Sequence, residues 1–325
     1  MARNSNATVL ITAPYFVPVV ERYRSELERV GVRLLCPPVR ERLSESELMA
    51  LAGSFDGVIC GDDPFTQSVL EACAPRLRVI SKWGTGIDAI DKIVAARLGI
   101  RVCNTPDAFT IPVAESVLGY MLAFARRQPW MNAQMKAGVW QKVSCGVLHG
   151  ATLGVVGVGN IGKAVLRRTS AFGMKLLGND IVDIDPGFLR EVGVSMVALD
   201  ELLRSADYVS VNPDLNPSSF HLINAARLAR MKPDAVLINC SRGPVVQEAD
   251  LIAALQRGAI RGAALDVFED EPLPENSPLR GFENVLLAPH NSNSSRPAWE
   301  HVHANTVRNL LDGLGISEQI VVQEA

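Results

Sequence analysis

The chain has 325 residues, a mass of 35.1 kDa and a formal net charge of −3. At roughly 150 residues per domain, this length predicts two domains, each large enough for its own core. Hydrophobic residues make up 48% and charged residues 21%, which excludes a disordered chain and a low-complexity array. Lys and Arg (32) nearly balance Asp and Glu (35) without a dense basic cluster, so no nucleic-acid partner is expected.

The six cysteines are far apart and form no C-x-x-C pair. Neither a zinc site nor a redox dithiol is expected, and no metal is predicted. The first apolar run, residues 7–13, is broken by Pro14 and is too short for a signal sequence or a membrane span. We therefore expect a cytoplasmic protein without a membrane partner.

Short runs rich in Val, Ile and Leu alternate with longer amphipathic stretches from Ala7 onward. This alternation is typical of parallel strands that are buried on both faces, and it predicts an α/β fold with two doubly wound domains. The first series predicts a small flavodoxin-like domain with strands at 7–12, 32–36, 56–60, 77–81 and 100–103.

A second series begins at Ala151, after a predicted loop at 128–150. It predicts a nucleotide-binding Rossmann sheet of six strands at 152–157, 175–180, 208–212, 235–240, 261–266 and 285–288. The tail at 299–314 has helical spacing but no strand of its own to cover, so we expect it to return to the first domain. The predicted division is a discontinuous substrate (catalytic) domain, 1–106 with 292–325, and a cofactor domain, 107–291.

An apolar strand runs directly into the motif G-x-G-x-x-G and then into a helical stretch. Gly157 permits the tight turn, Gly159 lets the backbone approach a pyrophosphate, and Gly162 lets the helix pack on the strand. Asn160 and Ile161 complete the loop that we expect to hold the cofactor. The alternative is a glycine-rich turn that binds no ligand.

Asp180 ends the next predicted strand, 18 residues after Gly162. A carboxylate at this place accepts hydrogen bonds from an adenosine ribose and repels a 2′-phosphate, so NAD rather than NADP is the expected cofactor. The alternative is a solvated aspartate in a turn.

Three later segments also follow predicted strands, where an open α/β sheet presents its ligand crevice. They supply Arg242, Glu271 and His290. Arg242 offers a planar fork of donors for a carboxylate, His290 can exchange a proton near neutral pH, and Glu271 can orient the imidazole. Taken singly, these residues can instead be a surface arginine, part of an acidic loop and a turn histidine.

Several ordered segments together carry a resemblance that covers almost the whole chain: 82–91, 99–106, 113–115, 138–140, the glycine loop and the three strand ends. With these motifs the chain resembles the D-isomer-specific 2-hydroxyacid dehydrogenases, the family that includes the phosphoglycerate dehydrogenases. The resemblance implies an NAD-dependent oxidoreductase that interconverts a D-2-hydroxy acid and its 2-oxo acid by hydride transfer. The implied partner is therefore a small 2-hydroxy or 2-oxo acid.

The resemblance also implies a role for individual residues. Arg242 is implied as the anchor of the substrate carboxylate, His290 as the acid/base and Glu271 as its partner. Asp266 is implied to hold the nicotinamide carboxamide, with Asn212, Cys240 and His290 beside the cofactor. The implied substrate loop of the first domain comprises Lys82, Trp83, Gly84, Thr85 and Gly86, which would put the reacting carbon between the domains.

Two departures from the family pattern bear on the substrate. Asp62 and Asp63 stand where phosphoglycerate dehydrogenases carry a basic residue, which argues against 3-phosphoglycerate, whereas Lys82 falls where those enzymes carry an arginine. After His290, the segment 291–295 is polar and lacks the small-residue pair common in the family.

The stretch 111–127 predicts an apolar helix, and aromatic and methionine side chains follow it at Trp130, Met131, Met135 and Trp140. This pattern and the resemblance predict a homodimer formed through the cofactor domain. Alternatively, Trp130 and Trp140 cover the core of their own domain. Two other functions stay open: a non-catalytic NAD-binding corepressor, and a dehydrogenase of a small anion such as formate or phosphite.

Overall fold

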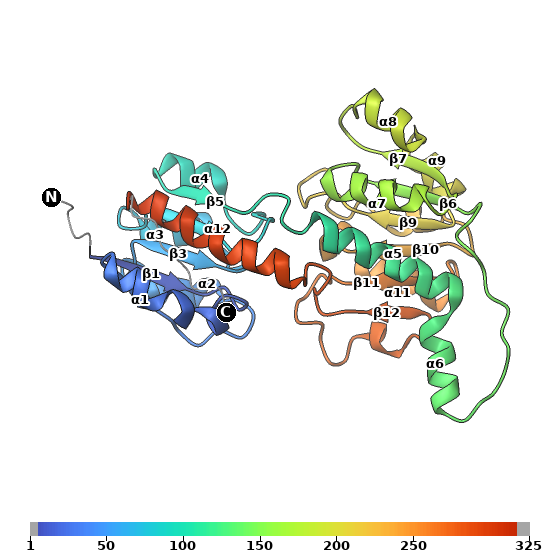
Figure 1. Ribbon diagram of the computed structural model, residues 1–325, viewed down its shortest axis with the longest axis horizontal. Coiled ribbons are helices and arrows are strands. Elements are labelled where there is room, and N and C mark those ends of the chain that lie inside the picture. The colour runs from blue at the N-terminus through green and yellow to red at the C-terminus, as the bar shows by residue number, and fades with distance from the viewer. Residues whose placement is uncertain (1–5, 317–325) are drawn as a thin grey trace. The chain divides into compact units, whose positions relative to one another are not determined.

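Two parallel sheets organise the chain in this computed structural model, which describes residues 6–316 (Figure 1). Unit 1 contains the chain up to Phe109 and again from Ser295 onward, and unit 2 is Thr110–Ser294. The predicted boundaries, after residues 106 and 291, lie close to these. Phe109 stays with unit 1 because its ring packs on Trp83. Ser292 stays with unit 2 because its N–H donates to the Asp266 carboxylate.

The sheet of unit 1 has, within the described residues, five parallel strands in the order β2-β1-β3-β4-β5. This order is that of a flavodoxin-like sheet, as the strand pattern predicts. The strands are β1 (Ala7–Ile11), β2 (Val32–Leu35), β3 (Gly57–Cys60), β4 (Val79–Lys82) and β5 (Arg101–Cys103). The helices between them are η1 (Val17–Val19), α1 (Glu21–Arg29), α2 (Glu45–Leu51), α3 (Gln67–Cys73) and α4 (Lys92–Arg97).

Polar side chains fix the starts of α2, α3 and α4. Ser44 and Glu47 form a reciprocal capping box at α2, and Asp91 accepts two backbone N–H groups at the start of α4. The strands between the helices are almost wholly apolar, and β1, β3 and β4 are buried along their full length. Local capping and strand burial together explain why this stretch folds as alternating layers.

The final helix, α12 (Arg296–Leu314), packs on the sheet of unit 1 across β3 and β4 (Figure 1). Ser81 in β4 donates its hydroxyl to the carbonyl of Thr306 at 2.7 Å. Gly57 leaves room for Leu310, because a Cβ at this position would lie 2.9 Å from the leucine Cδ1. The returning tail therefore covers a face of the first sheet.

The sheet of unit 2 has, within residues 6–316, seven parallel strands in the order β12-β11-β10-β9-β6-β7-β8. Read from β8, this is the Rossmann order with one strand added. The strands are β6 (Thr152–Val156), β7 (Lys175–Asn179), β8 (Val194–Met196), β9 (Tyr208–Val211), β10 (Val236–Asn239), β11 (Gly262–Leu265) and β12 (Val285–Leu287). The helices are α5 (Thr110–Arg126), α6 (Gln128–Lys136), α7 (Asn160–Ser170), α8 (Pro186–Val192), α9 (Leu199–Ser205), α10 (Ala225–Leu228), η2 (Gly243–Val245), α11 (Glu248–Gln256) and η3 (Pro278–Gly281).

Two elements of unit 2 differ from prediction. The expected sheet lacked β8, an edge strand of three residues in which only Val194 is buried, so that it carries too little apolar signal. The segment 128–150 is not a loop throughout, because its first part forms α6. This helix buries none of its side chains, so it lacks the buried apolar face on which the prediction of helices from periodicity relies.

No helix among residues 6–316 combines the length and the apolar character that crossing a membrane requires.

Candidate active site

The strands of unit 2 end in register at one edge of the sheet. Cα pairing joins Val156 to Val211, Val211 to Asn239, Asn239 to Leu265 and Leu265 to Leu287. The segments that follow these residues therefore leave the sheet side by side. They contain the glycine loop and all three residues expected to act on the substrate.

The glycine loop joins β6 to α7. Gly157 has φ +85°, and a Cβ there would lie 2.7 Å from the backbone nitrogen of Pro213. A Cβ on Gly162 would overlap the carbonyl of Gly157, whereas one on Gly159 would meet nothing within 4 Å. The loop thus packs against backbone at Gly157 and Gly162, and it leaves open space next to Gly159, the N-cap residue of α7. An open loop at the N-terminus of a helix suits a pyrophosphate.

Asp180 follows β7 and turns its carboxylate toward the glycine loop. One oxygen accepts the N–H of Val158 at 2.6 Å, and the other accepts the N–H of Ile181 at 2.7 Å. Backbone donors therefore fix the position of this negative charge beside the phosphate loop. Asn212, after β9, instead turns its amide back to Ser210 in its own strand.

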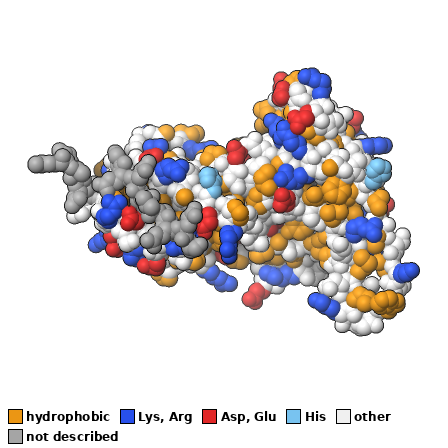
Figure 2. All heavy atoms as spheres, viewed as in Figure 1, with side chains coloured by type: hydrophobic (Ala, Val, Ile, Leu, Met, Phe, Trp, Pro, Cys, Tyr) orange, Lys and Arg blue, Asp and Glu red, His pale blue; other side chains and the backbone are white. Residues whose placement is uncertain are grey.

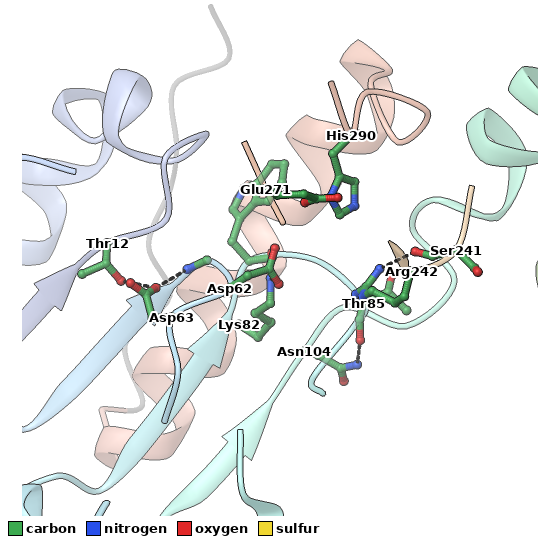
Figure 3. A network of polar contacts seen from close by, with 12 residues as sticks. Thr12, Asp62, Asp63, Lys82, Thr85, Asn104, Ser241, Arg242, Glu271 and His290 are labelled. Atoms are coloured by element: carbon green, nitrogen blue, oxygen red, sulfur yellow. Dashed lines mark hydrogen bonds and ion pairs between the residues drawn. The ribbon is translucent and has the colours of Figure 1, made fainter. Parts of the chain in front are cut away.

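His290 and Glu271 form a pair at the same edge. The Nδ1 atom of His290 lies 2.9 Å from Oε2 of Glu271, and the other carboxylate oxygen accepts the N–H of Phe268 at 2.9 Å (Figure 3). With a hydrogen on Nδ1, the imidazole turns Nε2 away from the carboxylate. This arrangement orients a histidine for proton exchange at Nε2.

The backbone of His290 adopts a left-handed conformation with φ +49°. Its N–H donates to the carbonyl of Asp266 at 2.7 Å, and the N–H groups of Asn291 and Ser292 donate to the Asp266 carboxylate at 2.8 and 2.9 Å. Asp266 itself is 1% exposed. It holds a strained turn in place, and such strain is frequent at functional sites.

Arg242 lies in the loop after β10, which packs tightly against the loop after β11. A Cβ on Gly243 would overlap the backbone of Phe268, so only glycine allows this approach. Asn239 holds the arginine loop by donating to the carbonyl of Arg242 at 2.9 Å. The guanidinium itself donates to the carbonyl of Ser241 at 2.9 Å.

Tyr120 of α5 lies near Cys240 and Asp266 of this site, and the sequence reasoning did not include it. Burial raises the pKa of its hydroxyl, and the nearby Cys240 and Asp266 raise it further. Burial likewise raises the pKa of Cys240 to about 12, so the thiol is neutral at physiological pH. A tyrosine within the predicted apolar helix 111–127 could have marked this residue as a candidate, but only the fold places it beside Asp266.

In unit 1, the expected substrate loop begins at the carboxyl end of β4. Lys82 is 5% exposed, and its ammonium donates to the carbonyl of Trp83 at 3.1 Å and pairs with Asp62 at 3.1 Å (Figure 3). Thr85 donates its hydroxyl to the carbonyl of Thr105 and accepts the amide of Asn104 at its own carbonyl. The loop is therefore tied to its own unit on both sides.

The indole of Trp83 is buried in an aromatic cluster that also contains Tyr15, Phe109, Trp299 and His303. Its N–H donates to Nδ1 of His303 at 3.0 Å. The side chain of Trp83 is thus engaged in this cluster, and within the loop 83–86 the residue offers only its backbone. His303 is buried and His301 is exposed, so the two histidines point to different sides of α12, as their spacing predicts.

We expect His303 to make unit 1 sensitive to acid. Burial, with the positive charge of Arg22, lowers its pKa from 6.5 to about 4, although Glu300 opposes this shift. The unfolded chain binds the proton first, so the stabilisation is complete above pH 6.5 and is lost as the pH falls toward 4. We expect His303→Gln, which keeps an acceptor for Trp83, to lose less stability between pH 7 and pH 4.5 than the wild type does, by about 2 kcal/mol.

Urea denaturation of both proteins at the two pH values measures this difference. His301→Gln on the same helix is the control and should follow the wild type. Equal acid sensitivity of the wild type and His303→Gln would refute the assignment.

Among the described residues 6–316, no three His, Cys, Asp or Glu side chains are grouped so that they could hold a metal ion.

Residues 118–292 match the family model for the NAD-binding domain of D-isomer specific 2-hydroxyacid dehydrogenases. The chain therefore belongs to this family, and unit 2 contains its NAD-binding domain. Among its relatives is the D-3-phosphoglycerate dehydrogenase of Methanocaldococcus jannaschii, 40% identical over 96% of this chain and 59% of that protein. The glyoxylate reductase of Thermofilum pendens is also 40% identical, over 85% of this chain and 81% of that protein.

Solved structures agree with this assignment over nearly the full length. A D-lactate dehydrogenase from Aquifex aeolicus, complexed with NAD and lactic acid, has a TM-score of 0.84 and 28% identity, with 98% of this chain and 100% of that chain covered. A glyoxylate reductase from Paecilomyes thermophila has a TM-score of 0.83 and 27% identity, with 98% of both chains covered. By contrast, the chain spans only 59% of the M. jannaschii enzyme and 53% of the Synechocystis D-3-phosphoglycerate dehydrogenase.

Proposed function

We propose that this protein is an NAD-dependent dehydrogenase that interconverts a D-2-hydroxy acid and its 2-oxo acid. The observation that carries the proposal is the oriented pair of His290 and Glu271, on the same sheet edge as a glycine loop that is open for a pyrophosphate. The names of the relatives support the reaction class, since they include reductases and dehydrogenases of small hydroxy and oxo acids.

The cofactor fits the residues present. Gly157, Gly159 and Gly162, with the loop residues Asn160 and Ile161, would receive the pyrophosphate, and Asp180 would accept the ribose hydroxyls. Asp266 and Cys240, both at strand ends of the same edge, would lie beside the nicotinamide. When bound, the oxidised cofactor would accept a hydride from the substrate carbon that bears the hydroxyl, and the reduced cofactor would supply one to the carbonyl carbon.

The chain's own residues would bind the substrate carboxylate and transfer the proton. The Arg242 guanidinium holds the substrate carboxylate through two parallel hydrogen bonds. In reduction, Nε2 of His290 gives its proton to the carbonyl oxygen, and in oxidation it takes the proton from the hydroxyl. Glu271 keeps the Nδ1 hydrogen in place and stabilises the imidazolium.

An absorbance assay tests the proposal directly. NADH oxidation should be seen with at least one of glyoxylate, hydroxypyruvate, pyruvate and 3-phosphohydroxypyruvate. A protein that binds NADH but turns over none of these acids would contradict the proposed activity and favour a binding role alone.

Asp180 should determine the choice of cofactor. Replacing it by asparagine keeps a hydrogen-bond acceptor for Val158 but removes the charge that would repel a 2′-phosphate. We expect Asp180→Asn to raise the ratio of kcat/KM for NADPH to that for NADH by about tenfold or more. Asp183→Asn, an equal charge change at a nearby exposed residue, serves as the control. An unchanged ratio in Asp180→Asn would disprove this role.

We further propose that the protein is a homodimer formed through unit 2. Hydrophobic side chains gather over the region of α5 and α6 in Figure 2, and exposed residues there include Met135, Val139 and Trp140, the last 86% exposed. Trp130 does not contribute in the same way, because it packs on Phe124 and donates to the carbonyl of Glu283. Light scattering at micromolar concentration should therefore give twice the chain mass, and a single 35 kDa particle would contradict the dimer.

All six cysteine thiols are free. This supports a location in the cytoplasm, where thiols stay reduced, as part of the same proposal.

A further inference from the structure

Two neighbouring loops of unit 2 carry residues that we expect to act in the reaction. The loop after β10 holds Arg242, and the loop after β11 holds Glu271. The two backbones are in close contact, because a Cβ on Gly243 would overlap the carbonyl of Phe268. This packing brings the residues that follow Gly243 next to those that follow Phe268.

A pair of glutamates, Glu248 and Glu269, connects these loops through reciprocal hydrogen bonds, and we call it the glutamate bracket. The N–H of Glu248 donates to Oε1 of Glu269 at 3.1 Å, and the N–H of Glu269 donates to Oε2 of Glu248 at 3.3 Å. Glu248 begins α11, the helix that follows the Arg242 loop, and Glu269 lies two residues before Glu271. Each carboxylate therefore holds the backbone of the other segment.

The start of α11 requires an acceptor from outside the helix. The first N–H groups of a helix have no partner within it, and the N-cap residue Gln247 makes no side-chain cap hydrogen bond. Glu269 supplies an acceptor from the neighbouring loop, and its negative charge suits the positive end of the helix dipole. The bracket thus uses a helix start to fix the loop that leads to Glu271.

The bracket brings negative charges together. Burial raises the pKa of Glu248, and the charges of Glu269 and Asp270 raise it further, although the hydrogen bond from the Glu269 backbone opposes this shift. Repulsion of this kind costs stability, and such a cost is frequent where a group serves a function. His221 contacts Oε1 of Glu269 from the loop after β9, so it belongs to neither bracketed segment.

We propose that Glu248 and Glu269 are positioning residues that keep Arg242 and Glu271 at the separation the reaction requires. The proposal rests on the proposed function, and neither glutamate of the bracket is expected to touch the substrate. In that function Arg242 binds the substrate carboxylate and Glu271 orients His290. A shift of one loop against the other therefore moves the anchor of the substrate relative to the acid/base, and small displacements of this kind lower the rate steeply.

Glu248→Ala removes one acceptor of the bracket and should lower kcat/KM for the 2-oxo acid by about tenfold, with the affinity for NADH within about twofold of the wild type. Glu248→Gln keeps an acceptor oxygen and should restore most of the activity. Glu248→Ala combined with Glu269→Ala should lie within about threefold of the more impaired single variant, because both changes break one unit. Steady-state kinetics with the acid that the wild type reduces fastest and fluorescence titration of NADH give these values.

Asp250→Ala is the matched control. Asp250 lies in the same first turn of α11, and its carboxylate also accepts a backbone N–H from another segment, that of Ala225 at 2.6 Å. Ala225 begins α10 rather than a loop that holds Arg242 or Glu271. The loss of stability should be similar to that of Glu248→Ala, since each variant loses a hydrogen bond to a carboxylate, but kcat/KM should stay within about twofold of the wild type.

Hydrogen–deuterium exchange tests the bracket without turnover. The backbone N–H groups of residues 266–271 should exchange about fivefold faster or more in Glu248→Ala, and at the wild-type rate in Glu248→Gln and Asp250→Ala. Unchanged exchange or unchanged kinetics in Glu248→Ala, no rescue by Glu248→Gln, or an equal kinetic loss in Asp250→Ala refutes the positioning role and leaves the enzyme assignment in place. If the wild type reduces none of the acids, the proposed function fails, and exchange alone decides whether the bracket fixes the loop.

Discussion

Replacing His290 by asparagine should lower kcat by about 10³-fold while the affinity for NADH stays near that of the wild type. Asparagine tolerates the left-handed backbone found at this residue, so the variant removes the imidazole without adding backbone strain. The loss follows because the asparagine amide, unlike the imidazole, cannot exchange a proton with the substrate oxygen. Stopped-flow measurement of NADH oxidation and fluorescence titration of NADH separate the two quantities.

His221 is a closely matched control. It also has φ +49°, lies in unit 2 and pairs with a carboxylate, Glu269, at 2.8 Å. His221→Asn should therefore have nearly full activity if the effect at His290 is chemical. Comparable losses in the two variants would show that the histidines act on the fold, and the acid/base role of His290 would then be wrong.

Replacing Arg242 by alanine should lower kcat/KM for the 2-oxo acid by about 10³-fold, because the substrate loses a bidentate, charge-assisted contact. Arg242→Lys keeps the charge but not the planar fork, and it should recover only part of this loss. Steady-state kinetics at saturating NADH give both values. The affinity for NADH should change little, since the expected partner of Arg242 is the substrate carboxylate.

Arg257→Ala provides the control for the loss of a positive charge in unit 2. This residue is exposed at the end of α11, and its removal should leave the kinetics unchanged. A defect in Arg242→Ala that is confined to NADH binding would contradict the proposed role. Full activity of Arg242→Lys would also contradict it, because a positive charge without the planar fork would then be sufficient to bind the substrate.

The candidate site could be predicted from the sequence where a local pattern carries the information. The glycine loop combines a tight turn at Gly157, an open position at Gly159 and a close approach of helix to strand at Gly162, all within a few residues. Arg242, Glu271 and His290 follow three separate apolar runs, and parallel strands bring their carboxyl ends to one edge. The sequence therefore indicated that Glu271 and His290 lie at the same end of the sheet, and the structure shows their contact.

The fold shows the same division between strong and weak local signals. The buried central strands were predictable because apolar runs between capped helices repeat many times along the chain. The edge strand β8 and the helix α6 were not, because neither buries a continuous apolar face. Elements that contribute little to the core leave little trace in the composition of the sequence.

The sequence by itself determined the α/β class and the glycine loop and marked Arg242, Glu271 and His290 as candidates for the chemistry, since these signals depend on short-range spacing. Only the tertiary structure decided which side chains are partners across long separations. It pairs Lys82 with Asp62, it seats Trp83 on His303, 220 residues away, and it makes Asp266 hold the turn after His290. Such contacts depend on strand register and packing, which bring distant residues within bonding distance without any local pattern to mark them.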